Sequence, residues 1–204
     1  MALTIKPIQQ KRMTIRIVGT SPLQQHQWDE KAKRQMREKQ AGKKSKDREI
    51  RDPQAEFEAA TYRTAKGKYG FPGMALKRAI ISAAHKDLGI EKTLVRKALF
   101  LHIEDPGGII ELDCKPPRMR EDMMRVGMGS VDLRYRPEFA EGWAANIDIE
   151  FDSELLTEQD VITLVDRAGF GVGIGEGRPE VGRDFGRFKV DTSAEITVGK
   201  KRAR

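Results

Sequence analysis

Glycines occupy five alternate positions between Gly169 and Gly177, and arginines follow them closely. Their spacing never matches G-x-G-x-x-G, and G-x-x-x-x-G-K-[ST] occurs nowhere in the chain, which excludes the Rossmann and P-loop interpretations. Backbone without side chains lets a polyanion approach the amide groups, while guanidinium groups pair with phosphates. The segment therefore predicts an anion-binding loop of Gly173, Gly175, Gly177, Arg178, Arg183 and Arg187. The alternative is that these glycines only allow the loop to pack closely against a sheet.

A second candidate is the turn and helix start at residues 70–79, with the sequence GFPGMALKRA. Small residues at a helix N-terminus expose amide groups to an anion, and two cations follow within the first turns. The candidate binding residues here are Gly73, Lys77 and Arg78. An ordinary amphipathic helix with solvated cations is the alternative.

The third candidate is residues 115–137, where methionines, arginines and an aromatic residue mix without a clean period. Aromatic and basic side chains together are typical of grooves that hold single-stranded nucleic acid, by stacking and charge pairing. The candidate RNA-binding residues in this insertion are Arg118, Arg120, Arg134, Tyr135 and Arg136. Its methionines could wedge between bases, pack on a neighbouring subunit or simply fill a core.

Residues that could carry catalysis or hold a metal are few. A single cysteine, Cys114, and three histidines exclude an intrachain disulfide and multi-cysteine metal sites, so we expect neither a metal nor another cofactor. Asp29 lies in a charged segment and is interpreted as a solvated helix-start residue. His26 could act as an acid or base but has no identifiable partner, so no catalytic residue is predicted and we expect a protein that is not an enzyme.

The composition indicates an anionic partner. The 204 residues include 38 Lys and Arg against 31 Asp and Glu, a formal net charge of +7. Nucleic acid and an acidic membrane face both fit this balance. No apolar run is long enough to span a bilayer, and the N-terminus lacks the apolar core of a signal peptide. We therefore expect a soluble, intracellular protein, and composition alone does not choose between the two partners.

The elements that must position these candidates alternate between strands and helices. Period-2 patterns predict strands at 13–18, 99–103, 109–112, 143–151 and 188–190, with 99–103 and 109–112 forming a hairpin. Helices are predicted after Gly73 and after a Thr157 cap, the second ending at a C′ glycine, Gly169. Residues 24–68 predict a basic, mobile insertion, and residues 191–204 a basic tail.

This order predicts one α+β domain over residues 1–204 with a ferredoxin-like, RRM-like βαββαβ core. Its antiparallel sheet would carry both helices on one face, with long insertions. The three middle segments, 99–103, 109–112 and 143–151, compete for two places in the sheet.

Read together, the turn-and-helix segment at 70–79 and a glycine loop closing on Gly186-Arg187-Phe188 resemble motifs of the RAMP superfamily of CRISPR-associated proteins. The start at residues 17–23, followed by a long insertion, fits the same resemblance. The chain is most similar to the backbone subunits that polymerise along guide RNA, and also to RAMP-like proteins of phages and prophages. Met74 and Ala75 stand where the family often has two serines.

The resemblance implies subunits stacked head to tail on RNA, with Lys77, Arg78 and the loop from Gly173 to Arg178 facing the guide backbone. It also implies a thumb-like insertion, assigned to residues 115–137 or to 24–68. The expected partners are a guide or other single-stranded RNA, a complementary DNA or RNA, and further copies of the chain in a filament, with no membrane partner. The same resemblance implies a cytoplasmic protein of a bacterial or phage-infected cell. Two alternatives stay open: a metal-independent guide-processing ribonuclease using His26, and a phage protein that binds or anneals single-stranded DNA.

Overall fold

A five-stranded antiparallel sheet forms the body of the molecule. The computed structural model describes residues 7–27, 37–38, 40–42, 51–84, 88–126 and 129–200. Strand β1 (Gln10–Gly19) pairs with β8 (Ala144–Asp152) along one edge, and β8 pairs with β4 (Leu99–His102). Along its other edge β1 pairs with β9 (Phe188–Val190) near one end and β10 (Thr197–Lys200) near the other. The predicted α+β class with an antiparallel sheet is confirmed.

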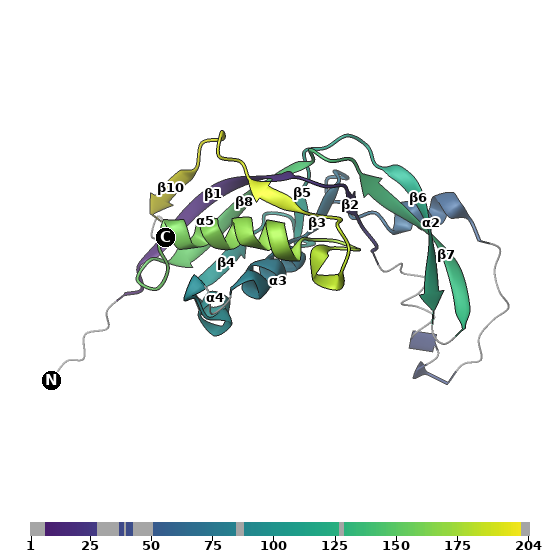
Figure 1. The fold of residues 1–204 in the computed structure, drawn as a ribbon, viewed down its shortest axis with the longest axis horizontal. Helices are drawn as coiled ribbons and strands as arrows, with labels where there is room; N and C mark the ends of the chain where they lie inside the picture. Colours follow the sequence, from purple (N-terminus) through teal and green to yellow (C-terminus); the bar gives the residue numbers. More distant parts are fainter. Residues whose placement is uncertain are drawn as a thin grey trace.

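One face of this sheet is the core. Met13, Ile15 and Ile17 are buried, while Thr14 and Arg16 between them point to the opposite face. The buried face packs against α3 (Gly73–Ala83), α4 (Lys92–Ala98) and α5 (Glu158–Arg167) (Figure 1). Thr157 and Asp160 form a capping box at the start of α5, which confirms the predicted cap.

The predicted hairpin of 99–103 with 109–112 is wrong. Strand β5 (Ile109–Glu111) pairs instead with β3 (Gly70–Pro72), directly before α3. Asp105 forms the turn between β4 and β5, and its carboxylate accepts hydrogen bonds from the amides of Ala65 and Gly107. These bonds tie the turn to the loop at residue 65 and lead the chain out of the main sheet.

A second β-structure extends away from the body (Figure 1). Strands β6 (Arg118–Val126) and β7 (Ser130–Phe139) form a long antiparallel hairpin, and β2 (Leu23–Gln24) pairs with the body end of β7. Helix α2 (Pro53–Ala59) lies against β7, with Asp52 capping its N-terminus and Phe57 buried. Residues 51–68 therefore differ from the predicted mobile insertion, because they hold an ordered helix and buried Thr61.

The end of the chain departs from prediction at two points. Gly169 is not a C′ cap, since the chain continues from α5 into a π-helical turn, η2 (Ala168–Val172). A Cβ at Gly169 would lie 2.0 Å from the carbonyl oxygen of Phe188, so glycine is needed there for close packing on β9. Part of the predicted basic tail forms β10, while residues 201–204 lie outside the described residues, as do Trp28, Asp29 and Met128. No helix among the described residues is long and apolar enough to cross a bilayer.

Candidate nucleic-acid interface

The structure brings the first two candidate segments together around one cavity. Helix α3 forms one wall, and the glycine loop between η2 and the short helix η3 (Pro179–Val181) forms the other. The cavity has a volume of about 350 Å³. Its polar lining comes from Gln25, His26, Tyr62, Arg78, Glu176, Arg178 and Glu180.

The glycines of this loop are required by backbone geometry. Gly173, Gly175 and Gly177 all have positive φ, between 63° and 78°, a region that other residues rarely adopt. A Cβ at Gly175 would lie 2.3 Å from the carbonyl oxygen of Gln24. Positive φ and close packing therefore account for Gly173, Gly175 and Gly177, as the alternative interpretation held, whereas a Cβ at Gly171 would meet nothing within 4 Å.

The expected exposure of the loop amides is wrong for three of them. The N–H of Gly173 donates to Ala168, that of Ile174 to Gly186, and that of Glu176 to Gln24. These bonds consume the donors that a polyanion would need. Anion binding at this loop would therefore depend on its side chains.

The helix side contributes one open cation. Arg78 lines the cavity, is exposed, and forms no ion pair with any described residue. Gly73 is buried and donates its N–H to the carbonyl of Gly108, so this amide is also occupied.

Lys77, the other cation at the start of α3, lies outside the cavity and contacts α4. Its ammonium donates to the carbonyl of Val95 and lies 5.1 Å from the centre of the Phe100 ring. Burial lowers the pKa of Lys77 to about 8. Lys77 does not line the cavity, and its contact with RNA stays a prediction.

The third candidate segment places its charges on one face of the β6–β7 hairpin. Arg120 lies opposite Arg136, Asp122 opposite Arg134, and Arg118 opposite Glu138. Directly opposite residues share a face of a sheet, as do alternate residues of one strand. We call these six residues the arginine face; it carries four guanidinium groups and two carboxylates.

The Glu138 carboxylate of the arginine face accepts hydrogen bonds from two arginines of the same face. Arg118 donates to one oxygen of Glu138 at 2.7 Å, and Arg120 to the other at 2.8 Å. These charged hydrogen bonds outweigh burial and keep the pKa of Glu138 below its ordinary value. Arg120 also lies over the Phe185 ring, which joins the hairpin to the end of the glycine loop.

His26 lies between the hairpin and the cavity. Its Nε2 is 3.2 Å from Nη1 of Arg134. A guanidinium can only donate, so Nε2 must accept and the imidazole is neutral, with its proton on Nδ1. Burial, followed by the charges of Arg136 and Arg134, lowers the pKa of His26 and favours the same neutral form.

Unsatisfied polar groups gather at the base of the hairpin. Arg136 is 2% exposed, and its closest carboxylate contact is 3.9 Å, from Nη1 to Asp122. Within the described part of the chain, the buried side-chain atoms without a hydrogen-bond partner are Gln24 Oε1, His26 Nδ1, Asp122 Oδ2 and Arg136 Nε. Buried polar groups are nearly always paired, so these four atoms are places where a bound group could form hydrogen bonds.

The remaining predicted residues surround this region. Arg178 lines the cavity and donates to Glu180 at 2.8 Å. Arg183 lies beside Gly177, and its charge helps to lower the pKa of Arg136. Arg187 lies over the exposed Phe170 ring, away from the cavity lining, and Tyr135 lies on the face of the hairpin opposite the arginine face.

Residue types alone did not reveal Gln24, Glu138 and Glu176 as parts of the site. A polar alternation could have revealed the hairpin, because 118–122 reads R-x-R-x-D and 134–138 reads R-x-R-x-E. That period-2 pattern is typical of two strands sharing a polar face.

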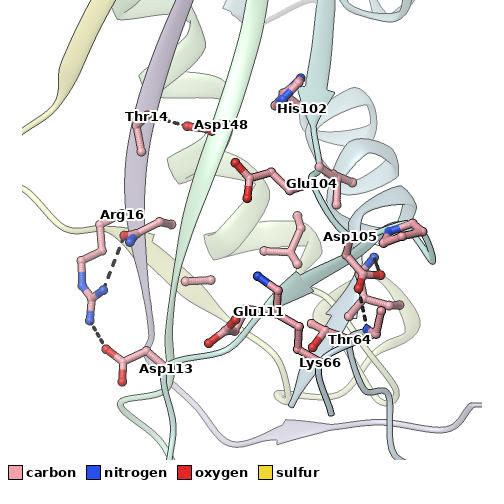
Figure 2. Close-up of a pocket in the computed structure, with 17 residues that line it drawn as sticks. Thr14, Arg16, Thr64, Lys66, His102, Glu104, Asp105, Glu111, Asp113 and Asp148 are labelled. Carbon is pink, nitrogen blue, oxygen red and sulfur yellow. Dashed lines mark hydrogen bonds and ion pairs between the residues drawn. The ribbon is translucent and has the colours of Figure 1, made fainter. Parts of the chain in front are cut away.

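A larger cavity of about 510 Å³ lies on the opposite face of the main sheet (Figure 2). Thr14, Asp148 and His102 line it from neighbouring strands, and Asp148 accepts hydrogen bonds from Thr14 and Arg12. Five carboxylates line it against two cations; the carboxylates are Glu104, Asp105, Glu111, Asp113 and Asp148, and the cations are Arg16 and Lys66. This face therefore repels a polyanion, which leaves the arginine face and the first cavity as the candidate interface. Among the described residues, no group of three or more His, Cys, Asp and Glu could hold a metal ion.

No protein-family model matches the sequence, and no curated protein matches it. Among solved structures, a chain of the type III-B Cmr-beta complex bound to cognate target RNA matches with a TM-score of 0.50 at 11% identity. The match covers 94% of this chain and 61% of that one, so this chain spans about three fifths of its length. Cmr6 from Pyrococcus furiosus matches with a TM-score of 0.46 at 10% identity, over 89% of this chain and 98% of that one. The predicted resemblance to RAMP-type CRISPR proteins is confirmed for the fold.

Proposed function

We propose that this chain is an RNA-binding protein that oligomerises along a guide RNA and presents it for pairing with a complementary strand. The observation that carries the proposal is the arginine face meeting the α3 cavity through His26 and the glycine loop. The chain of similar fold comes from a complex bound to cognate target RNA, which supports RNA as the ligand.

The topology supports an RRM-like core. In chain order, and with the intervening elements left out, β1, α3, β4, β8, α5 and β9 give the order βαββαβ, with β1 lying between β9 and β8 in the sheet. Unlike many RRM domains, however, the open sheet face here is rich in carboxylates. RNA would therefore bind on the other side, between hairpin and helix, with the hairpin as the thumb.

Recognition would be divided between protein and RNA. The accessible guanidinium groups of Arg118, Arg120 and Arg134 on the arginine face, together with Arg78, would contact phosphates without regard to sequence. Base pairing would supply specificity. The proposal assigns no catalytic residue to the chain, and it places the protein in the cytoplasm.

The first test is to purify the protein without nuclease and sequence any nucleic acid that accompanies it. A discrete RNA with fixed ends supports the proposal. Heterogeneous single-stranded DNA would instead support the DNA-binding alternative and contradict the guide-bound role.

The second test is the salt dependence of RNA binding by the Arg78→Ala variant. Arg78 forms no ion pair with a described residue, so its guanidinium group is available to a phosphate. Because a phosphate contact does not depend on the base, removal of Arg78 should weaken binding equally for all sequences. The slope of log K against log salt should become shallower by roughly 0.7, the value of one contact to a single strand. Lys66→Ala removes one exposed cation at the acid-rich cavity and is the matched control, with no change expected. Equal slopes for both variants and wild type would remove Arg78 from the interface.

The ribonuclease alternative has less support. The Nε2 lone pair of His26 already accepts from Arg134, so it cannot take a proton until that contact breaks. Incubation of the protein with the accompanying RNA precursor, with His26→Gln as the inactive control, would reveal cleavage if this alternative holds.

A further inference from the structure

The α3 cavity has a mixed lining, in which apolar walls stand beside charged and polar side chains. Its walls include aliphatic and aromatic side chains from β2, β3, α3, η2 and the glycine loop; they are Leu23, Phe71, Ala75, Ala79, Val172 and Ile174. A partly open cavity of about 350 Å³, with apolar walls and several polar groups, suits a flat ligand with apolar faces and a polar edge. A phosphate group alone has no apolar face to bury.

Glu176 is the polar group of the cavity that would select the polar edge of a ligand. Its backbone N–H donates to the carbonyl of Gln24 at 2.9 Å, which holds the residue in place. Its carboxylate lines the cavity, lies near His26 and Arg136, and accepts no hydrogen bond from any described residue. A carboxylate can only accept, so a ligand edge that presents an N–H or O–H donor would suit this side of the cavity.

The second carboxylate of the cavity is already satisfied. Glu180 accepts from Arg178 at 2.8 Å and from Ser82 at 2.9 Å. The two carboxylates of the lining, Glu176 and Glu180, balance the two guanidinium groups, Arg78 and Arg178, so the lining has no net charge that would draw a phosphate into the cavity. Arg78 at the exposed margin is the group that a phosphate outside the cavity would reach.

We propose that the α3 cavity holds one nucleobase that carries an exocyclic amine, with the amine donating to Glu176. This inference rests on the proposed RNA-binding function and adds a base preference at one nucleotide to it. Adenine, cytosine and guanine each present an amino group, whereas uracil presents none. The phosphate next to the bound base would pair with Arg78.

The test compares cytidine and uridine oligomers, whose bases are close in size and differ in the amino group. Wild-type protein should bind the cytidine oligomer more tightly, by roughly tenfold for one well-placed contact. In Glu176→Gln this ratio should fall towards one, because the amide can donate to the uracil carbonyl as well as accept. Comparing ratios between variants cancels the different stiffness of the two oligomers.

Glu180→Gln is the matched control, since it makes the same charge change in the same cavity at a carboxylate that is already paired. It should keep the wild-type ratio. Tight binding of both oligomers with the same ratio in wild type and Glu176→Gln would overturn the base preference and leave RNA binding intact. Failure of the folded wild type to bind either oligomer would overturn the proposed function itself.

Discussion

At the scale of single residues, the interface is defined by incomplete pairing as much as by charge. The Arg136 guanidinium is buried with a single carboxylate contact near 4 Å, at Asp122. Burying a charge with an incomplete partner is costly, and a ligand that supplies the missing partner recovers that cost. An arginine on the surface would not have this cost, because water would form hydrogen bonds with its guanidinium group.

His26 gives a pH-dependent prediction. Its pKa lies below the ordinary value of 6.5, because burial and neighbouring arginines disfavour the charged ring. The unfolded chain therefore binds a proton that the folded chain resists, so His26 contributes no penalty above pH 6.5 and destabilises the fold as the pH falls below it. Denaturant unfolding at several pH values should show wild type losing more stability on acidification than His26→Gln.

The comparison with His26→Gln separates this histidine from the carboxylates. Groups such as Asp148 and Glu138 also lose favourable interactions in acid, but they do so equally in both proteins. Parallel stability curves for the two proteins between pH 7 and pH 5 would contradict a neutral, arginine-bound His26.

At the scale of elements, the sequence pattern predicted correctly those strands and helices that pack against the core on one side only. Met13, Ile15 and Ile17 alternate with polar residues because one face of β1 is core and the other is open. The cap at Thr157 depends only on neighbours three residues apart. Such local rules made β1, α3, β8 and α5 predictable.

Non-local choices could not be predicted in the same way. Strand β5 follows β4 after a tight turn, which suggested a hairpin, yet its partner β3 lies far back in the sequence. The β6–β7 hairpin has no hydrophobic period in its sequence, because neither face is a continuous apolar surface. One face is the arginine face, and on the other Met123 is exposed. A high density of charge likewise concealed α2, whose single buried residue in the helix is Phe57.

The glycine-rich loop that runs from Gly173 through η3 to Gly186 gives a stability prediction at the same scale. A Cβ at Gly186 would lie 1.8 Å from the carbonyl oxygen of Ile174, and the residue has φ of +67°. Gly186→Ala should therefore destabilise the protein by roughly 2–4 kcal/mol, from backbone strain and the displacement of Ile174. Thermal unfolding should show this as a clearly lowered Tm.

Gly182→Ala is the control within the same loop. Gly182 has φ of +82°, but an added Cβ would meet nothing within 4 Å. It should cost only the strain of a positive φ, about 1 kcal/mol. If both variants lost equal stability, close packing of the loop would not explain its glycines.

At the scale of the whole molecule, the net charge of +7 conceals two unlike sides. The open sheet face gathers carboxylates around its cavity, while the hairpin and glycine loop gather arginines. A polyanion approaching from solution is therefore steered to one side of the protein. An RNA strand lying there would leave the far face of the main sheet uncovered.

Assembly along RNA gives the prediction at this scale. If copies of the chain polymerise on a strand, the mass of the complex should rise in equal steps as the RNA lengthens by equal increments. Light scattering on complexes with a graded series of RNA lengths measures these steps, and a labelled complementary strand should then bind without displacing protein. The Arg78→Ala variant should need more protein to reach the same steps, because each protomer loses a phosphate contact. A constant mass, with one protomer on every RNA length, would contradict oligomerisation while leaving RNA binding by the single chain in place.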